Sequence, residues 1–130
     1  MRVAADTNVL LRLLVGDDPA QLATAKAFLE TATTIIVSNI VLVETVRVLA
    51  RTLKYRREEI ASALRALSDA DMFEFDRQAA EAGIAMMERG GDFADGIILW
   101  EASRLRCDQV VTFDRNFARA GGRLPVVLLE

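Results

Sequence analysis

Four acidic residues have the type and the position that chemistry would need: Asp6, Glu44, Asp95 and Asp114. The chain contains no histidine, which excludes Ser-His-Asp triads, Cys-His pairs, paired-histidine ribonuclease chemistry and the usual histidine zinc sites. Only two residues are lysine, so P-loop and Schiff-base chemistry have almost no candidates. Catalysis in this chain would therefore depend on carboxylates, arginines, hydroxyls or a bound metal.

Two of the acids follow predicted strands directly. Asp6 comes after the apolar residues 3–5, and a helix is predicted to open near Asn8. Asp114 follows a predicted strand over 109–112 in the same way. Each acid alone is well explained as a turn or helix-capping residue. However, ligands in open α/β sheets bind beyond the carboxyl ends of the strands, so two acids at such ends favour a site there.

Asp95 is the acid whose neighbours most favour a function. Asp92 is predicted to cap a helix that reaches about residue 106, which places Asp95 at the third helical position, where the helix dipole would also stabilise a carboxylate. Ile98 and Leu99 follow on the same face, and the helix is expected to be buried nearly all round. A carboxylate on an apolar face is costly unless it is paired, protonated or bound to a cation.

Glu44 fits two interpretations equally well. It lies on a predicted helix over 39–53, beside Arg47 and Arg51, so a solvated face with ion pairs explains it. Apolar residues flank it on the same side, which favours a function instead. Four carboxylates brought together would repel one another. A divalent cation would neutralise them, and oxygen ligands suit magnesium or manganese in a site for phosphodiester hydrolysis.

Strands and helices alternate along the rest of the chain. Further strands are predicted over 33–37, 72–75 and 126–129, and further helices over 19–32, 57–68 and 76–88. This alternation predicts an α/β fold, a three-layer α/β/α sandwich with a mostly parallel central sheet. No repeat, linker or low-complexity segment interrupts it, so we expect a single domain over residues 1–130.

Composition restricts the class of protein further. With 52% hydrophobic and 27% charged residues, the chain is expected to be globular. No apolar run is long enough to span a bilayer, no signal peptide is recognisable, and one cysteine cannot form an internal disulfide, so we expect a cytoplasmic protein. The net charge is -3. Either the substrate is not a polyanion, or the acids are concentrated at one site and arginines surround it.

Four stretches of the chain resemble motifs of PIN-domain proteins. Residues 3–11 (VAADTNVLL) resemble the opening D-T-N motif, residues 38–44 (SNIVLVE) the second acidic motif, residues 92–98 (DFADGII) the D-F-A-D-A-L-I stretch, and residues 111–117 (VTFDRNF) the final T-F-D-R-x-F stretch. Their order and spacing agree over essentially the whole chain. The combination is closest to the VapC-type toxins of bacterial toxin–antitoxin pairs.

This resemblance implies a ribonuclease that depends on magnesium or manganese. It implies that the metal is bound by Asp6, Glu44, Asp95 and Asp114. Residues with a role in orienting carboxylates or water would be Thr7, Asn8, Asp92, Thr112 and Asn116, with Asp92 acting mainly as the helix cap. Whether Asp114 or Asn116 faces the metal stays open. Gly96 stands where relatives usually carry alanine and is expected to loosen the helix start.

The resemblance also implies partners for the protein. These are an RNA substrate, a second copy in a homodimer, and a cognate antitoxin whose C-terminal segment masks the site. Arg115 and Arg119 are candidate phosphate contacts, although each is more simply explained as a surface arginine. Trp100 belongs to a core-like apolar pattern, which argues against base stacking.

The sequence argues against other classes of protein. A phosphoaspartate protein needs a late lysine, and none follows Lys54; a haloacid-dehalogenase-like phosphatase needs a second aspartate where Asn8 stands. The remaining alternative is a PIN-fold protein-binding module without nuclease activity. The presence of all four acids argues against such a loss of activity.

Overall fold

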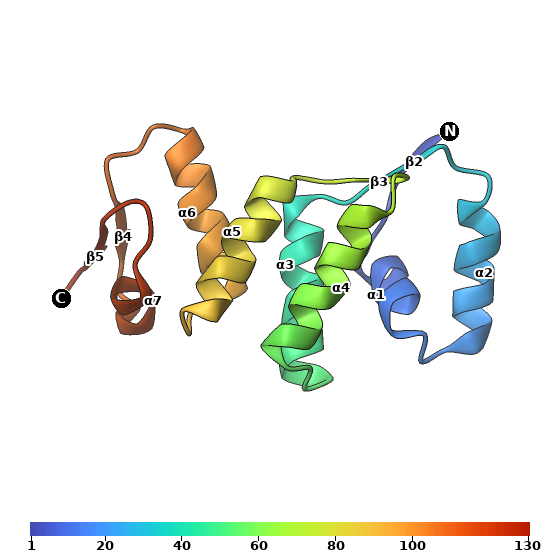
Figure 1. Ribbon diagram of the computed structural model, residues 1–130, viewed down its shortest axis with the longest axis horizontal. Helices are drawn as coiled ribbons and strands as arrows, with labels where there is room; N and C mark the ends of the chain where they lie inside the picture. The colour runs from blue at the N-terminus through green and yellow to red at the C-terminus, as the bar shows by residue number, and fades with distance from the viewer. The chain divides into compact units, whose positions relative to one another are not determined.

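The computed structural model describes all 130 residues and divides them into two compact units, Met1–Asp76 and Arg77–Glu130. The first unit contains β1 (Arg2–Ala4), α1 (Thr7–Val15), α2 (Pro19–Leu29), β2 (Thr34–Ile36), α3 (Asn39–Arg47), the π-helical turn η1 (Val48–Thr52), α4 (Arg57–Asp69) and β3 (Phe73–Glu74) (Figure 1). The second contains α5 (Arg77–Glu88), α6 (Phe93–Arg104), β4 (Val110–Thr112), α7 (Arg115–Ala120) and β5 (Val126–Leu128). Strands alternate with helices as predicted.

All strand pairs are parallel, which confirms the predicted α/β class. The strands are divided between two sheets: β1, β2 and β3 form one in the first unit, with β2 in the centre, and β4 pairs with β5 in the second. The segment after β4 forms the helix α7. No helix in the structure combines the length and the apolar character that crossing a bilayer requires.

The three-stranded sheet positions Asp6 in the first unit. Val3 lies opposite Ile35 in the register of β1 and β2, and the amide of Ala5 donates to the carbonyl of Ile36 at 2.9 Å. Ala5 and Ile35 are buried in a small core together with Leu29 of α2. Sheet pairing therefore continues to the residue before Asp6, and Asp6 follows the carboxyl end of β1 as predicted.

Capping residues set the starts of α2 and α3 where the sequence predicts them. The carboxylate of Asp18 accepts from the amide of Gln21 at 3.0 Å, and Pro19 occupies the first turn, where its missing N–H costs nothing. Ser38 caps α3. The helix predicted to reach residue 53 is α-helical only to Arg47 and continues as the wider turn η1, whose amide-to-carbonyl bond spans five residues.

Two glycines set the packing of α5 and α6 in the second unit. Gly83 and Gly96 are both buried. A Cβ atom at Gly96 would lie 2.7 Å from the Cα of Gly83 and would also clash with the carbonyl oxygen of Ala82. The expectation that Gly96 loosens the helix start is therefore wrong, because its missing side chain lets the two helix backbones approach each other. Next to this contact, Leu99 packs in a core with Met86 and Phe117.

Candidate functional site

Asp6 and Glu44 are connected through Thr7 in the first unit. The carboxylate of Asp6 caps α1 and accepts from the amide of Thr7 at 2.8 Å. The hydroxyl of Thr7 then donates to Oε2 of Glu44 on α3 at 2.9 Å. Thr7 is buried, whereas both carboxylates are exposed. The structure therefore gives Glu44 a specific partner on another helix, and this partner is the threonine that was predicted to orient a carboxylate.

Three aspartates influence one another in the second unit. Asp95 lies in the first turn of α6, where burial, and after it the negative charges of Asp92 and Asp114, raise its pKa from 3.8 to about 6. Asp92 is the predicted cap of α6, and its carboxylate accepts from the amide of Ala94 at 3.4 Å. The first turn of α6 is thus a place where negative charge accumulates and where a cation would be stabilised.

The surroundings of Asp95 differ from the sequence prediction in one respect. The helix α6 is not buried nearly all round, because Ile98 is 47% exposed and Trp100 is half-buried. Asp95 is itself half-buried. Its raised pKa therefore has two causes, partial burial and the two neighbouring carboxylates, and only the first was expected from the apolar pattern.

Asp114 is held by the backbone around it. Its carboxylate caps α7 by accepting from the amide of Asn116 at 2.8 Å, and its own amide donates to the hydroxyl of Thr112 at 3.0 Å. The side-chain amide of Asn116 instead donates to the carbonyl of Gly90 at 3.3 Å. The charge of Asp114 raises the pKa of Asp95, whereas the side-chain amide of Asn116 contacts backbone.

Capping and function are compatible at these positions. Asp6, Asp92 and Asp114 each cap a helix, as their simplest explanation predicts. A carboxylate has more acceptor positions than one capping bond uses, so a capping aspartate can also bind a cation. Neither unit by itself gathers three acidic, cysteine or histidine side chains closely enough to hold a metal ion.

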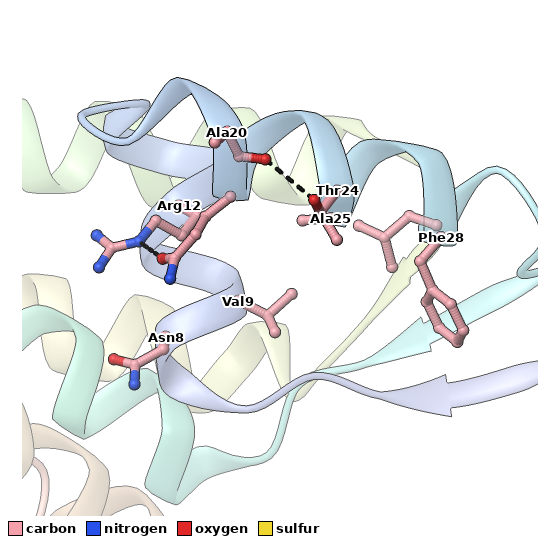
Figure 2. Close-up of a pocket in the computed structure, with 9 residues that line it drawn as sticks. Asn8, Val9, Arg12, Ala20, Thr24, Ala25 and Phe28 are labelled. Carbon is pink, nitrogen blue, oxygen red and sulfur yellow. Dashed lines mark hydrogen bonds between the residues drawn. The ribbon is translucent and has the colours of Figure 1, made fainter.

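Asn8 lines a groove of the first unit. It lines an apolar groove of about 550 Å³ between α1 and α2, together with Val9, Arg12 and residues of α2 that include Phe28 (Figure 2). The guanidinium of Arg12 donates to the side chain of Gln21 across this groove. No acidic residue lines it. The predicted role of Asn8 in orienting carboxylates therefore has no contact in its favour here.

The two arginines predicted to contact RNA lie on α7. Arg115 and Arg119 are exposed, and Arg119 donates to the side-chain oxygen of Asn116 at 3.3 Å. Their exposure leaves room for a phosphate, but nothing in their surroundings separates them from ordinary surface arginines.

A family model describes the chain as a whole. The model of the PIN domain matches residues 3–123. The chain belongs to the PIN domain family. Among solved structures, this PIN domain is similar to the VapC20 toxin of Mycobacterium tuberculosis, described as cleaving the sarcin-ricin loop, with 22% sequence identity and a TM-score of 0.44 over 93% of this chain and 95% of that chain. No curated protein matches the sequence.

Family membership covers both units of this PIN domain. The matched range contains Asp6, Glu44, Asp95 and Asp114 together with the residues that contact them. Sequence reasoning missed the close approach of Gly83 and Gly96, which fixes the start of α6 beside Asp95. A glycine in each helix was visible, but nothing in one sequence shows that the two face each other.

Proposed function

We propose that this PIN domain is a ribonuclease that hydrolyses RNA phosphodiester bonds with the help of Mg²⁺ or Mn²⁺, and that it is the toxin of a VapC-type toxin–antitoxin pair. The observation that carries the proposal is that all four acidic motifs of the family are present and that the carboxylates of Asp6, Glu44 and Asp114 each have a defined hydrogen-bond partner. Thr7 bonds to Asp6 and Glu44, and capping bonds fix Asp114.

The residues fit a divalent cation by the chemistry of their donor atoms. Asp6, Glu44, Asp95 and Asp114 would hold the ion with carboxylate oxygens, which suit Mg²⁺ and Mn²⁺. The raised pKa of Asp95 shows that negative charge in the first turn of α6 is poorly compensated. A bound cation supplies that compensation, activates water and stabilises the leaving oxygen.

The residues of the chain have separate tasks in this proposal. Thr7 holds the carboxylate of Glu44 by a hydrogen bond from its hydroxyl, which leaves the remaining oxygen available as a ligand. Thr112 fixes the backbone before α7 and so orients Asp114. Asp95 would hold the cation, and its carboxylate is also a candidate acceptor for a proton of the attacking water.

The partners implied by the resemblance belong to the same proposal. Asp6, Glu44 and Asp114 are exposed, as a site that accepts a polymer requires. An antitoxin segment that covers these carboxylates would stop cleavage. The homodimer stays a prediction of the resemblance. The organisation of residues 1–130 as a single domain stays a prediction from the sequence.

Cleavage of a mixed RNA pool by the purified chain tests the proposed function. We expect cleavage in Mg²⁺ or Mn²⁺, loss of cleavage in excess EDTA, and recovery when the metal is restored, because the carboxylates alone cannot activate water sufficiently. Cleavage that persists unchanged in EDTA would contradict the metal role. No cleavage combined with no metal binding would instead favour the protein-binding module.

A further inference from the structure

The second unit contains a cavity that the proposed chemistry does not use. Its volume is about 1020 Å³, and it lies along α5, α6 and the segment 120–123. The charged and aromatic residues that line it are Arg77, Glu81, Arg89, Arg123 and Trp100, which is the only tryptophan of the chain. None of the four candidate acids lines this cavity. It is therefore separate from the proposed catalytic carboxylates.

The charge of the cavity is opposite to that of the protein. Three arginines face one glutamate in its lining, whereas the whole chain has a net charge of -3. A cavity lined by an excess of one sign concentrates ligands of the opposite sign. Arginine in particular presents a planar fork of donors that matches phosphate oxygens. The cavity is thus suited to an anionic ligand.

Arg123 and Trp100 add a planar surface to this positive charge. The guanidinium of Arg123 lies over the indole ring, 5.5 Å from its centroid, at the distance of a cation–π interaction. No hydrogen bond or ion pair occupies the guanidinium, so its donors are available. Trp100 is half-buried at this cavity, which corrects the expectation that it belongs to the core. Unpaired RNA bases stack on aromatic rings and on arginine planes.

The segment that carries Arg123 is fixed to both helices. Arg89 of α5 donates from Nε to the carbonyl of Ala120 at 3.2 Å and from Nη2 to the carbonyl of Gly121 at 3.1 Å. A Cβ atom at Gly122 would lie 2.5 Å from Cδ1 of Leu99 in α6, so only glycine allows this close approach. The cavity wall is therefore preformed, which reduces the entropy lost when a ligand binds.

We propose that this cavity binds a single-stranded segment of the RNA substrate outside the cleaved bond. An unpaired base stacks on the surface formed by Arg123 and Trp100, and the guanidinium of Arg123 contacts a neighbouring phosphate. RNA offers both the planar ring and the regularly spaced phosphates, and the cavity has the size of a typical small-ligand site. The choice of RNA as the ligand rests on the proposed ribonuclease function.

The fluorescence of Trp100 tests this proposal, because it reports on this cavity alone. A short oligouridylate is titrated into the full chain in EDTA, so that binding is measured without cleavage. We expect saturable quenching, and about tenfold weaker binding in Arg123→Gln. The slope of log affinity against log salt should fall by about one, since one phosphate contact is lost. Arg123→Lys should be intermediate, because it keeps the charge but loses the planar fork.

Arg57→Gln is the matched control, since Arg57 is an exposed arginine that does not line the cavity. The control should bind like the wild type. Absence of quenching, or equal binding by Arg123→Gln and Arg57→Gln, would overturn the proposal. Saturable quenching by inorganic phosphate at the same concentrations would also overturn it, because it would indicate a site for a small anion.

Cleavage kinetics separate this proposal from the proposed function. In the metal-loaded enzyme, Arg123→Gln should raise KM by about the same factor while kcat stays unchanged. Cleavage with an unchanged KM would refute the RNA cavity and leave the ribonuclease intact. Arg123-dependent binding of oligouridylate by a chain that never cleaves RNA would refute the ribonuclease and leave the cavity intact.

Discussion

Asp95→Asn is expected to lower the rate of RNA cleavage by about 10²–10⁴-fold. Asp95 lies where partial burial and the charges of Asp92 and Asp114 raise its pKa to about 6. The amide of asparagine is a weak ligand for a divalent cation and cannot accept the proton of water. The rate is measured with saturating Mn²⁺ on the RNA pool. Asp108→Asn is the control, because it removes the same charge from an exposed acid outside the four motifs.

The same variant should keep the fold and gain stability in the absence of metal. A carboxyl group with a raised pKa in the folded state destabilises that state once it ionises, so wild-type stability falls as the pH rises from about 4 to 6. Asparagine is neutral at every pH and avoids this loss. Because Asp95 is only half-buried, solvent screening limits the gain to about 1 kcal/mol at neutral pH.

Thermal unfolding in EDTA, at neutral pH and at about pH 4, measures this gain. The stability difference between Asp95→Asn and the wild type should be present at neutral pH and shrink in acid. An unfolded variant would remove Asp95 as a test of catalysis, and full activity in a folded variant would contradict its catalytic role.

Gly96→Ala is expected to destabilise the protein by about 1–3 kcal/mol. Alanine is the better helix former by about 1 kcal/mol. In this chain, however, a Cβ atom at position 96 would collide with the carbonyl oxygen of Ala82 and lie 2.7 Å from the Cα of Gly83. Backbone atoms of a packed helix cannot move aside as a side chain can, so α5 and α6 must separate.

Denaturant unfolding of matched alanine and glycine variants measures this effect. Glu101 is exposed on the same helix. Comparing Glu101→Ala with Glu101→Gly gives the intrinsic preference of α6 for alanine, and the preference at position 96 should have the opposite sign. A Gly96→Ala variant as stable as the wild type would show that the two helices do not approach this closely.

The sequence predicts the elements of the fold well because local rules decide them. Asp18 and Pro19 set the start of α2, and Asp92 sets the start of α6, through capping bonds within a few residues. The end of β1 before Asp6 follows from three apolar residues that meet a polar turn. The contact of Gly83 with Gly96 and the stacking of Arg123 on Trp100 were not predictable, because they depend on which faces of two elements meet.

In the candidate site, too, the positions that local sequence decides were predictable, whereas the contacts between elements were not. Strand ends and motif spacing identify Asp6 and Asp114, and the structure confirms where they lie. The bond from Thr7 to Glu44 joins residues 37 positions apart, so only the packing of α1 on α3 reveals it. For Asp95, the apolar pattern anticipates burial but not the contribution of its acidic neighbours.

Calorimetric titration of the metal-free chain with Mn²⁺ tests the central claim most directly, namely that the acids of the four motifs bind a divalent cation. We expect that the wild type binds Mn²⁺, and that Asp6→Asn and Asp95→Asn each lower the affinity for Mn²⁺ at least about tenfold. Asp108→Asn should bind like the wild type. A wild type that binds no Mn²⁺, or a variant at position 6 or 95 with unchanged affinity, would contradict the account.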